Sequence, residues 1–141
     1  MSLNDILITP LSKKINLDGN ILKVLKKSDP GFTEFGEAYF SLLNFGKIKG
    51  WKQHTSMVSN LVVPVGRIKF VFYLENQTSQ KSFRIEEIGD TEYNRITVPP
   101  GIWFGFQGLQ NPLSVLLNIA SIEHDKNEEI SKPLIDIPFT W

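Results

Sequence analysis

Two polar side chains near the middle of the sequence, Lys52 and His54, have types and a spacing that suit proton-transfer chemistry. They lie in a stretch, residues 47–54, that reads as a β-strand, and residues two apart in a strand project from the same face. Imidazole titrates near neutral pH, so His54 is a candidate general acid or base. Lys52 is a candidate cation for a developing negative charge, or a base if burial favours its neutral form. If their shared face is exposed, the histidine is instead hydrogen-bonded at a strand end and the lysine is solvated.

Basic residues also gather around this stretch. Lys47 and Lys49 share one face of the expected strand, and Arg67 and Lys69 follow on a neighbouring one. A local cluster of this kind suits an anionic ligand such as a nucleotide diphosphate, even in a chain whose formal net charge is +0. Scattered surface charge is the alternative interpretation.

Three further residues are candidates for ligand contact. Asn60 and Asn118 occupy otherwise apolar strands, where an unpaired amide is costly. Each must therefore bind either a ligand or an internal backbone carbonyl. Trp103 either packs in the core or stacks on a base or a sugar.

Composition limits the classes of protein that this chain can represent. Its 141 residues, 41% hydrophobic and 21% charged, suit one globular domain that spans residues 1–141. The zero net charge argues against binding to nucleic acid or to an anionic membrane. The absence of cysteine excludes disulfides and thiolate-bound metals. With no membrane-spanning stretch and no signal-peptide core, we expect a cytoplasmic protein.

Short segments of alternating hydrophobicity, separated by turn residues at intervals of roughly 8 to 12 residues, indicate an all-β sandwich or barrel. In residues 67–74, Ile68 and its alternate neighbours lie on one face and Lys69 and its alternate neighbours on the other. We expect a polar loop at 75–81, and the only possible helix is at 126–132. The remaining expected strands are at 20–26, 35–44, 82–88, 93–98, 102–106 and 114–120.

Four motifs resemble the cupin-fold family of dTDP-4-dehydrorhamnose 3,5-epimerases, in particular a short-chain branch found in surface-polysaccharide pathways. These motifs are KGWKQH at 49–54, NLVVPVG at 60–66, TVPPGIWFGFQGL at 97–109 and LLNIA at 116–120. The resemblance implies a double-stranded β-helix, or jelly-roll, barrel that forms a homodimer and holds a nucleotide sugar inside the barrel. It also implies that Lys49 takes the place of the arginine that meets the pyrophosphate.

The catalytic positions of that family are occupied by other residues here. The resemblance aligns the family's catalytic histidine with Lys52 and its active-site lysine with Asn60. It places the family's proton-donating tyrosine near Asn118, and a further histidine at Phe104. The more distantly similar dTDP-sugar 3,4-ketoisomerases have a His-x-His pair at this strand, of which only His54 is matched.

The resemblance implies an isomerase, either an epimerase or a ketoisomerase, that acts on a dTDP-4-keto-6-deoxy sugar in deoxysugar and polysaccharide biosynthesis. His54 would transfer the proton next to the keto group while Lys52 stabilises the enolate, and no cofactor is needed. The alternative is a non-catalytic barrel that binds a sugar nucleotide or glycan. We expect no metal, because the chain's 2 histidines cannot supply the ligands of a metal-binding cupin. Apolar residues near the N-terminus, Ile6, Ile8 and Leu11, suit either strand exchange with a second subunit or cover for the chain's own sheet edge.

Overall fold

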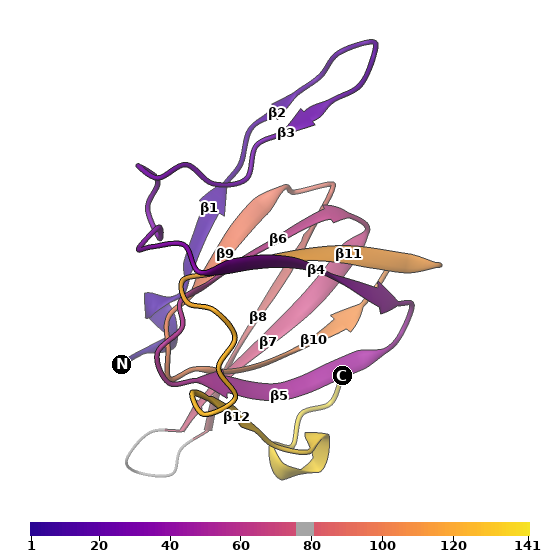
Figure 1. Cartoon of the computed structure of the whole chain (residues 1–141). Helices are drawn as coiled ribbons and strands as arrows, with labels where there is room; N and C mark the ends of the chain where they lie inside the picture. The colour runs from indigo at the N-terminus through magenta and orange to yellow at the C-terminus, as the bar shows by residue number, and fades with distance from the viewer. Residues whose placement is uncertain (76–80) are drawn as a thin grey trace.

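Two five-stranded antiparallel sheets face each other in the computed structural model, which describes residues 1–75 and 81–141 (Figure 1). The first sheet has the order β1-β9-β6-β11-β4, formed by Leu7–Pro10, Asn94–Val98, Ser59–Val65, Leu113–Ala120 and Glu37–Asn44. The second has the order β12-β5-β10-β7-β8, formed by Glu129–Ser131, Ile48–His54, Trp103–Gly108, Arg67–Glu75 and Lys81–Gly89. The expected all-β jelly-roll barrel is confirmed.

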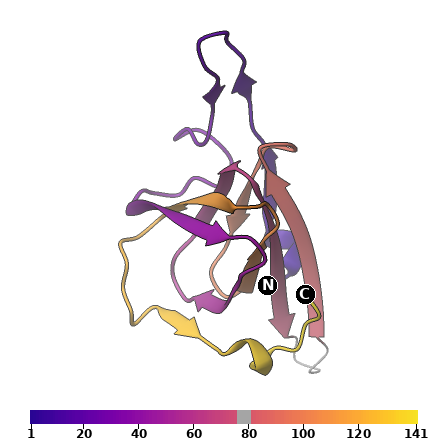
Figure 2. The same ribbon diagram turned by 90° about the vertical axis from the view of Figure 1, so that its right-hand side faces the viewer.

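A two-stranded hairpin stands away from the barrel as an arm (Figure 2). It pairs β2, Lys13–Lys14, with β3, Ile21–Leu22. The expected strand at 20–26 is therefore wrong in length. Its second half lies over the first sheet, where the carbonyl of Val24 accepts a hydrogen bond from Arg95. Two short 3-10 helices, Leu3–Asp5 and Leu134–Asp136, complete the elements.

The main core lies between the sheets and follows from the alternation along each strand. In β7, Phe70 and Phe72 point inward and are fully buried, with their rings stacked at 6.3 Å between centroids. Leu61, Val63 and Ile96 face them from the first sheet, and all three are buried in the same cluster. Alternate side chains of β11 are buried in the same way, and among them Leu116 joins this cluster while Asn118 is polar.

A second apolar cluster covers the outer face of the second sheet. Val71 and Tyr73 belong to it, so both faces of β7 are buried, which explains its nearly continuous apolar sequence. The C-terminal segment supplies the cover: Ile137 is buried in this cluster and Trp141 packs against it. Trp103 lies here as well, with the ammonium of Lys132 4.7 Å from its ring centroid.

The segment before the C-terminus and the segment at the N-terminus each add a strand to the edge of a sheet. Residues 126–132 do not form a helix, because their backbone instead pairs with β5 and adds β12 to its edge. At the N-terminus, β1 pairs with β9 of the same chain, and Ile6 is buried, so these residues cover their own sheet edge.

Most of the loop expected at 75–81 lies outside the described residues. The described part of the chain contains no helix with the length and hydrophobicity that a membrane span requires.

Candidate active site

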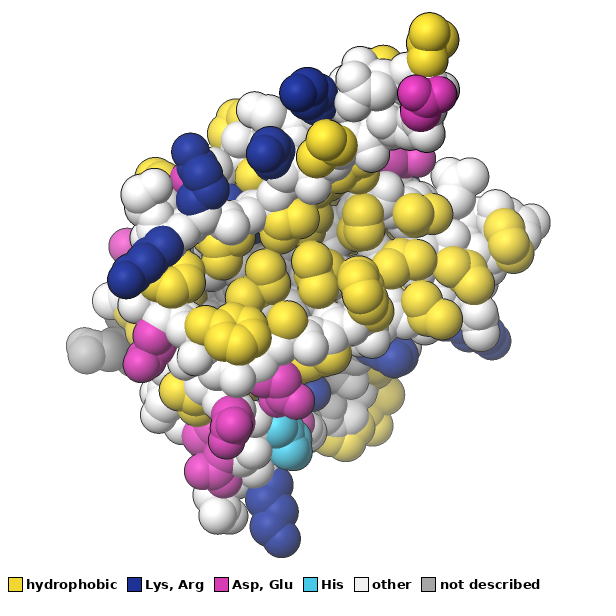
Figure 3. Space-filling view, turned by 45° about the horizontal axis from the view of Figure 1, so that its top comes forward, with side chains coloured by type: hydrophobic (Ala, Val, Ile, Leu, Met, Phe, Trp, Pro, Cys, Tyr) yellow, Lys and Arg dark blue, Asp and Glu magenta, His cyan; other side chains and the backbone are white. Residues whose placement is uncertain are grey.

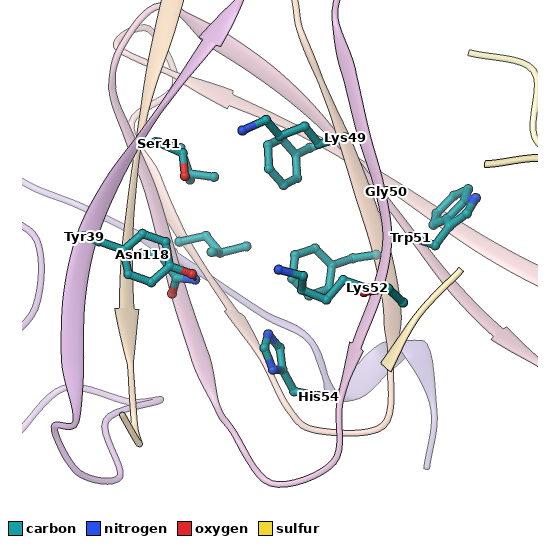
Figure 4. A pocket seen from close by; sticks show the side chains of 13 residues that line it. Tyr39, Ser41, Lys49, Gly50, Trp51, Lys52, His54 and Asn118 are labelled. Carbon is teal, nitrogen blue, oxygen red and sulfur yellow. The ribbon is translucent and has the colours of Figure 1, made fainter. Parts of the chain in front are cut away.

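A cavity of about 220 Å³ lies between the two sheets (Figure 4). Tyr39 from β4 and Asn118 from β11 are on one side of it. Lys49, Lys52 and His54, all from β5, are on the other side. Aromatic and aliphatic side chains fill the spaces between these polar groups. The cavity is therefore an apolar chamber with a few convergent polar groups, the usual character of a small-molecule site.

Lys52 and His54 share the inward face of β5, as their spacing predicts. Trp51 points the other way, into the outer aromatic cluster, 5.5 Å from Trp141 between ring centroids. Lys49 also lines the cavity, although strict alternation would place residues 49 and 52 on opposite faces. The pairing with β10 explains this: Phe104 pairs with Lys52 and Phe106 with Lys49, so β5 contains one extra residue at a bulge.

His54 is held by a buried carboxylate. Its Nδ1 lies 2.5 Å from Oε1 of Glu128, and both side chains are more than nine-tenths buried. The other carboxylate oxygen accepts hydrogen bonds from the backbone N–H groups of Ser56 and Met57. A carboxylate anchored in this way accepts a hydrogen bond from the Nδ1–H group of a neutral imidazole, so the Nε2 lone pair is left for a bound ligand.

The charge of Glu128 is maintained in spite of its burial. Burial raises the pKa of the Glu128 carboxyl, but the hydrogen bond from His54 and those from the backbone of Ser56 and Met57 outweigh it. The resulting pKa lies below the ordinary value of 4.5. At neutral pH the pair therefore holds a fixed negative charge next to the imidazole, which stabilises the imidazolium that forms when His54 accepts a proton.

Lys52 also pairs with a carboxylate, which lies on the segment that carries Glu128. Its Nζ lies 3.1 Å from Oε1 of Glu129, which directly follows Glu128 in sequence. An ammonium group held in this way at the cavity wall is suited to stabilise a negative charge on a ligand. The segment that adds β12 to the sheet thus supports both candidate catalytic residues of β5.

A tyrosine hydroxyl lies across the cavity from these groups (Figure 4). Tyr39 pairs directly with Asn118 in the register of β4 and β11, and Asn118 Nδ2 donates to its Oη at 2.9 Å. The cavity therefore holds an imidazole base on one side and a phenol on the other. A pair of this kind can remove a proton from a carbon and return one to it.

Four of the seven residues singled out from the sequence line the cavity, and three do not. Lys49, Lys52, His54 and Asn118 line it. Arg67 is on the surface, paired with Glu87 at 3.2 Å and with Glu92 at 3.4 Å. Trp103 packs in the outer cluster.

Asn60 points to the opposite face of the first sheet. There its Oδ1 accepts from Arg95 and Thr97, and its Nδ2 donates to the carbonyl of Gly31. Of the two partners considered for its amide, the structure shows an internal one.

This network makes a prediction for Asn60. Replacing it with alanine leaves the buried guanidinium of Arg95 without its Nε acceptor, so we expect the free energy of unfolding to fall by about 1–3 kcal/mol. KM for substrate should change by less than about twofold, since Asn60 does not line the cavity. Urea denaturation and steady-state kinetics measure the two effects. Asn44→Ala, at an exposed asparagine of β4, is the matched control. A raised KM with unchanged stability would place Asn60 in the binding site after all.

Two residues of the site, Tyr39 and Glu128, were not among the sequence-based candidates. Tyr39 alternates with Ser41 on β4, and both line the cavity, but nothing in that pattern shows which face of the strand is inward. Glu128 belongs to an acidic segment of the tail, with Asp125 and Glu129 close to it in sequence. Its contact with His54 spans 74 residues and depends on the fold.

The described residues include no group of three or more histidine, aspartate or glutamate side chains placed to hold a metal ion. His54, Lys52, Lys49 and Tyr39 are among the cavity side chains that can move a proton or stabilise a charge.

The double-stranded β-helix with its polar cavity is a cupin barrel, and its fold is similar to those of a dTDP-sugar isomerase and of a dTDP-4-dehydrorhamnose 3,5-epimerase. A dTDP sugar isomerase from Desulfovibrio desulfuricans G20 has a similar structure, with a TM-score of 0.90 and 29% identity over 97% of this chain and 90% of that one. The sugar 3,4-ketoisomerase QdtA from Thermoanaerobacterium thermosaccharolyticum, solved in complex with TDP, shares the fold. Its TM-score is 0.77, with 18% identity over 92% of this chain and 89% of QdtA.

Among curated proteins, the chain is similar to the probable low-salt glycan biosynthesis epimerase Agl13 of Haloferax volcanii. The two are 22% identical over an alignment of 128 residues, and the alignment covers 88% of this chain and 82% of Agl13. No protein-family model matches the sequence.

Proposed function

We propose that this chain is an isomerase, an epimerase or a ketoisomerase, that acts on a dTDP-linked 4-keto-6-deoxy sugar in deoxysugar and polysaccharide biosynthesis. The observation that carries the proposal is the buried His54–Glu128 pair, which lines the same cavity as Tyr39. The similarity to a dTDP sugar isomerase and to a glycan biosynthesis epimerase supports the same class of reaction.

The proposed reaction begins with removal of a proton beside the keto group. The carbonyl acidifies the neighbouring C–H bond, and Nε2 of His54 accepts the proton while the electrons of that bond form the enolate. The ammonium group of Lys52 stabilises the negative charge on the enolate oxygen. Tyr39 then donates its phenolic proton to the substrate from the other side of the cavity. No redox cofactor takes part, because the substrate and the product have the same oxidation state.

The cavity between the two sheets, with about 220 Å³ of space, has room for the sugar ring of such a substrate. Lys49 also lines the cavity, and its ammonium group is a candidate contact for the diphosphate of the substrate. A cytoplasmic location, where such a substrate would be available, remains a prediction.

The alternative is a barrel that binds a sugar nucleotide or glycan without reaction. Binding alone does not require an imidazole whose second nitrogen is fixed by a buried carboxylate, because a neutral hydrogen-bonding group would serve as well. The pairing of His54 with Glu128 therefore favours the enzyme.

The test of the function is solvent deuterium incorporation into dTDP-4-keto-6-deoxyglucose, followed by NMR. We expect the wild-type protein to introduce deuterium at C3 or C5, and the labelled position separates a reaction at one carbon from a reaction at two. Saturable binding without any exchange would favour the binding barrel. If the protein showed neither deuterium exchange nor binding, this substrate class would be rejected.

We also propose a homodimer that forms through the outer face of the first sheet. Phe40, Leu42 and Val65 are more than half exposed on this face, and Figure 3 shows hydrophobic side chains gathered over it. The adjacent arm has exposed apolar residues too, among them Leu17. A continuous apolar surface of this kind is typical of an interface. In a dimer with two-fold symmetry, the apolar surface of each copy would cover that of the other.

Leu42→Asp should weaken this dimer. A carboxylate at the centre of an apolar interface loses hydration without gaining a partner, so we expect the dimer dissociation constant to rise by roughly 30-fold or more, about 2 kcal/mol. Sedimentation velocity over a range of concentrations measures it. Ile85→Asp, at a half-exposed isoleucine of β8 in the other sheet, is the matched control and should leave the assembly unchanged. A wild-type protein that is monomeric at all concentrations would contradict the proposal.

A further inference from the structure

Asn118 stands next to Tyr39 with an unusual set of contacts. The residue is 6% exposed, and its Nδ2 donates to Tyr39 Oη at 2.9 Å. Its Oδ1 is buried and has no hydrogen-bond partner among the described residues. The amide is therefore bound on one side only, by the tyrosine, which faces it directly across the β4–β11 pair.

This contact limits what the Tyr39 hydroxyl can do. A phenol oxygen can accept hydrogen bonds and can donate its single proton. Because the N–H group of Asn118 is the donor in their contact, the phenolic proton is not used in it. Within the described part of the chain, no side chain or carbonyl accepts that proton. Since Tyr39 lines the cavity, the O–H bond is free to point toward a bound ligand.

We infer that Asn118 is the positioning residue that makes Tyr39 the proton donor of this cavity. The inference rests on the proposed function. When the phenolic O–H bond breaks and a new bond to hydrogen forms on the enolate, the oxygen of Tyr39 becomes negatively charged. The N–H group of Asn118 already points at that oxygen and stabilises the charge until a proton is regained from solvent. Tyr39 lies on an edge strand and is 41% exposed, so its hydroxyl needs such a fixed neighbour.

The test is Asn118→Asp, which keeps the size of the side chain but replaces the donor by an acceptor. The carboxylate would accept the phenolic proton and draw it away from the cavity. We expect product formation to fall by about 30-fold. Deuterium exchange at the carbon beside the keto group should stay within about threefold of wild type, because His54 still removes and returns that proton. The ratio of exchange to product formation should therefore rise. Tyr39→Phe, which removes the phenolic proton itself, should raise the same ratio.

Two further variants keep the test decisive. Asn118→Leu removes the donor without adding a charge, and its ratio of exchange to product formation should also rise, even if the aspartate variant folds poorly. Asn118→Leu combined with Tyr39→Phe should form product no more slowly than Tyr39→Phe alone, because the amide acts through the phenol. Asn44→Asp, the same substitution at an exposed position of β4, should behave as wild type.

The results separate this inference from the function on which it rests. Equal losses of exchange and of product in the Asn118 variants, or losses that add to that of Tyr39→Phe, would overturn the positioning role and leave the isomerase intact. A wild-type protein that neither exchanges nor converts the substrate would reject the function and the inference together.

Discussion

Replacing His54 with asparagine should lower turnover by about 10⁴-fold while the affinity for the nucleotide sugar stays within a few-fold of wild type. The asparagine amide can still donate to Glu128 from the position of Nδ1, so the buried carboxylate keeps a partner. What is lost is Nε2, the only nitrogen of this residue that can accept a proton from a substrate. Deuterium exchange at the carbon beside the keto group should disappear together with product formation.

The chain offers a matched control for this substitution. His124, its second histidine, is 65% exposed and lies outside the cavity, so His124→Asn should retain full activity. Isothermal titration with dTDP measures the affinity of both variants. An active His54→Asn protein would show that another group removes the proton, with Lys52 as the next candidate. An inactive protein that has also lost its affinity would indicate a binding role for His54.

Glu128→Gln should lower turnover by about 10³-fold, the second largest effect that we expect. An amide in place of the carboxylate can donate to Nδ1, which moves the imidazole proton to Nε2 and removes the lone pair that would accept the substrate proton. The amide also provides no negative charge for the imidazolium. Affinity for dTDP should remain within a few-fold, since the side chain lies behind His54. If turnover changed less than tenfold, the carboxylate would have a structural role only.

The same carboxylate makes the stability depend on pH. The pKa of Glu128 is lower in the folded chain than its ordinary value of 4.5. A carboxyl with a depressed pKa stabilises the folded state above its unfolded pKa, and this contribution is lost as the pH falls through the folded pKa. We therefore expect wild type to exceed Glu128→Gln in unfolding free energy by about 2 kcal/mol at neutral pH. The difference should shrink below pH 4.5. Urea denaturation at several pH values measures it, and a constant difference would contradict the assignment.

The sequence by itself determined most strands of the barrel and the faces of several of them. Alternation in 67–74 predicts the two faces of β7, and one face enters the core while the other lies under the C-terminal segment. The spacing of Lys52 and His54 predicts that they share a face, as they do. These features depend only on neighbours along the chain, because side chains in a strand alternate whatever packs on either side.

The sequence could not decide which face of a strand lines the cavity. Asn60 and Asn118 both interrupt apolar strands, yet one contacts Arg95 under the loop that leads to β4 and the other holds Tyr39 in the cavity. Periodicity defines two faces but does not say which is inward. Arg67 and Trp103 failed as candidates for the same reason, because both lie on faces that point away from the cavity.

Only the tertiary structure decided the chemistry of the site. It brings Glu128 to His54 across 74 residues, and a bulge in β5 turns Lys49 to the side of Lys52. It also places a tyrosine from β4 opposite the imidazole, where the family resemblance assigned one to the position of Asn118. Contacts of this kind depend on which distant segments pair and in what register. Local sequence patterns do not contain that information, because the pairing is fixed by the packing of the whole barrel.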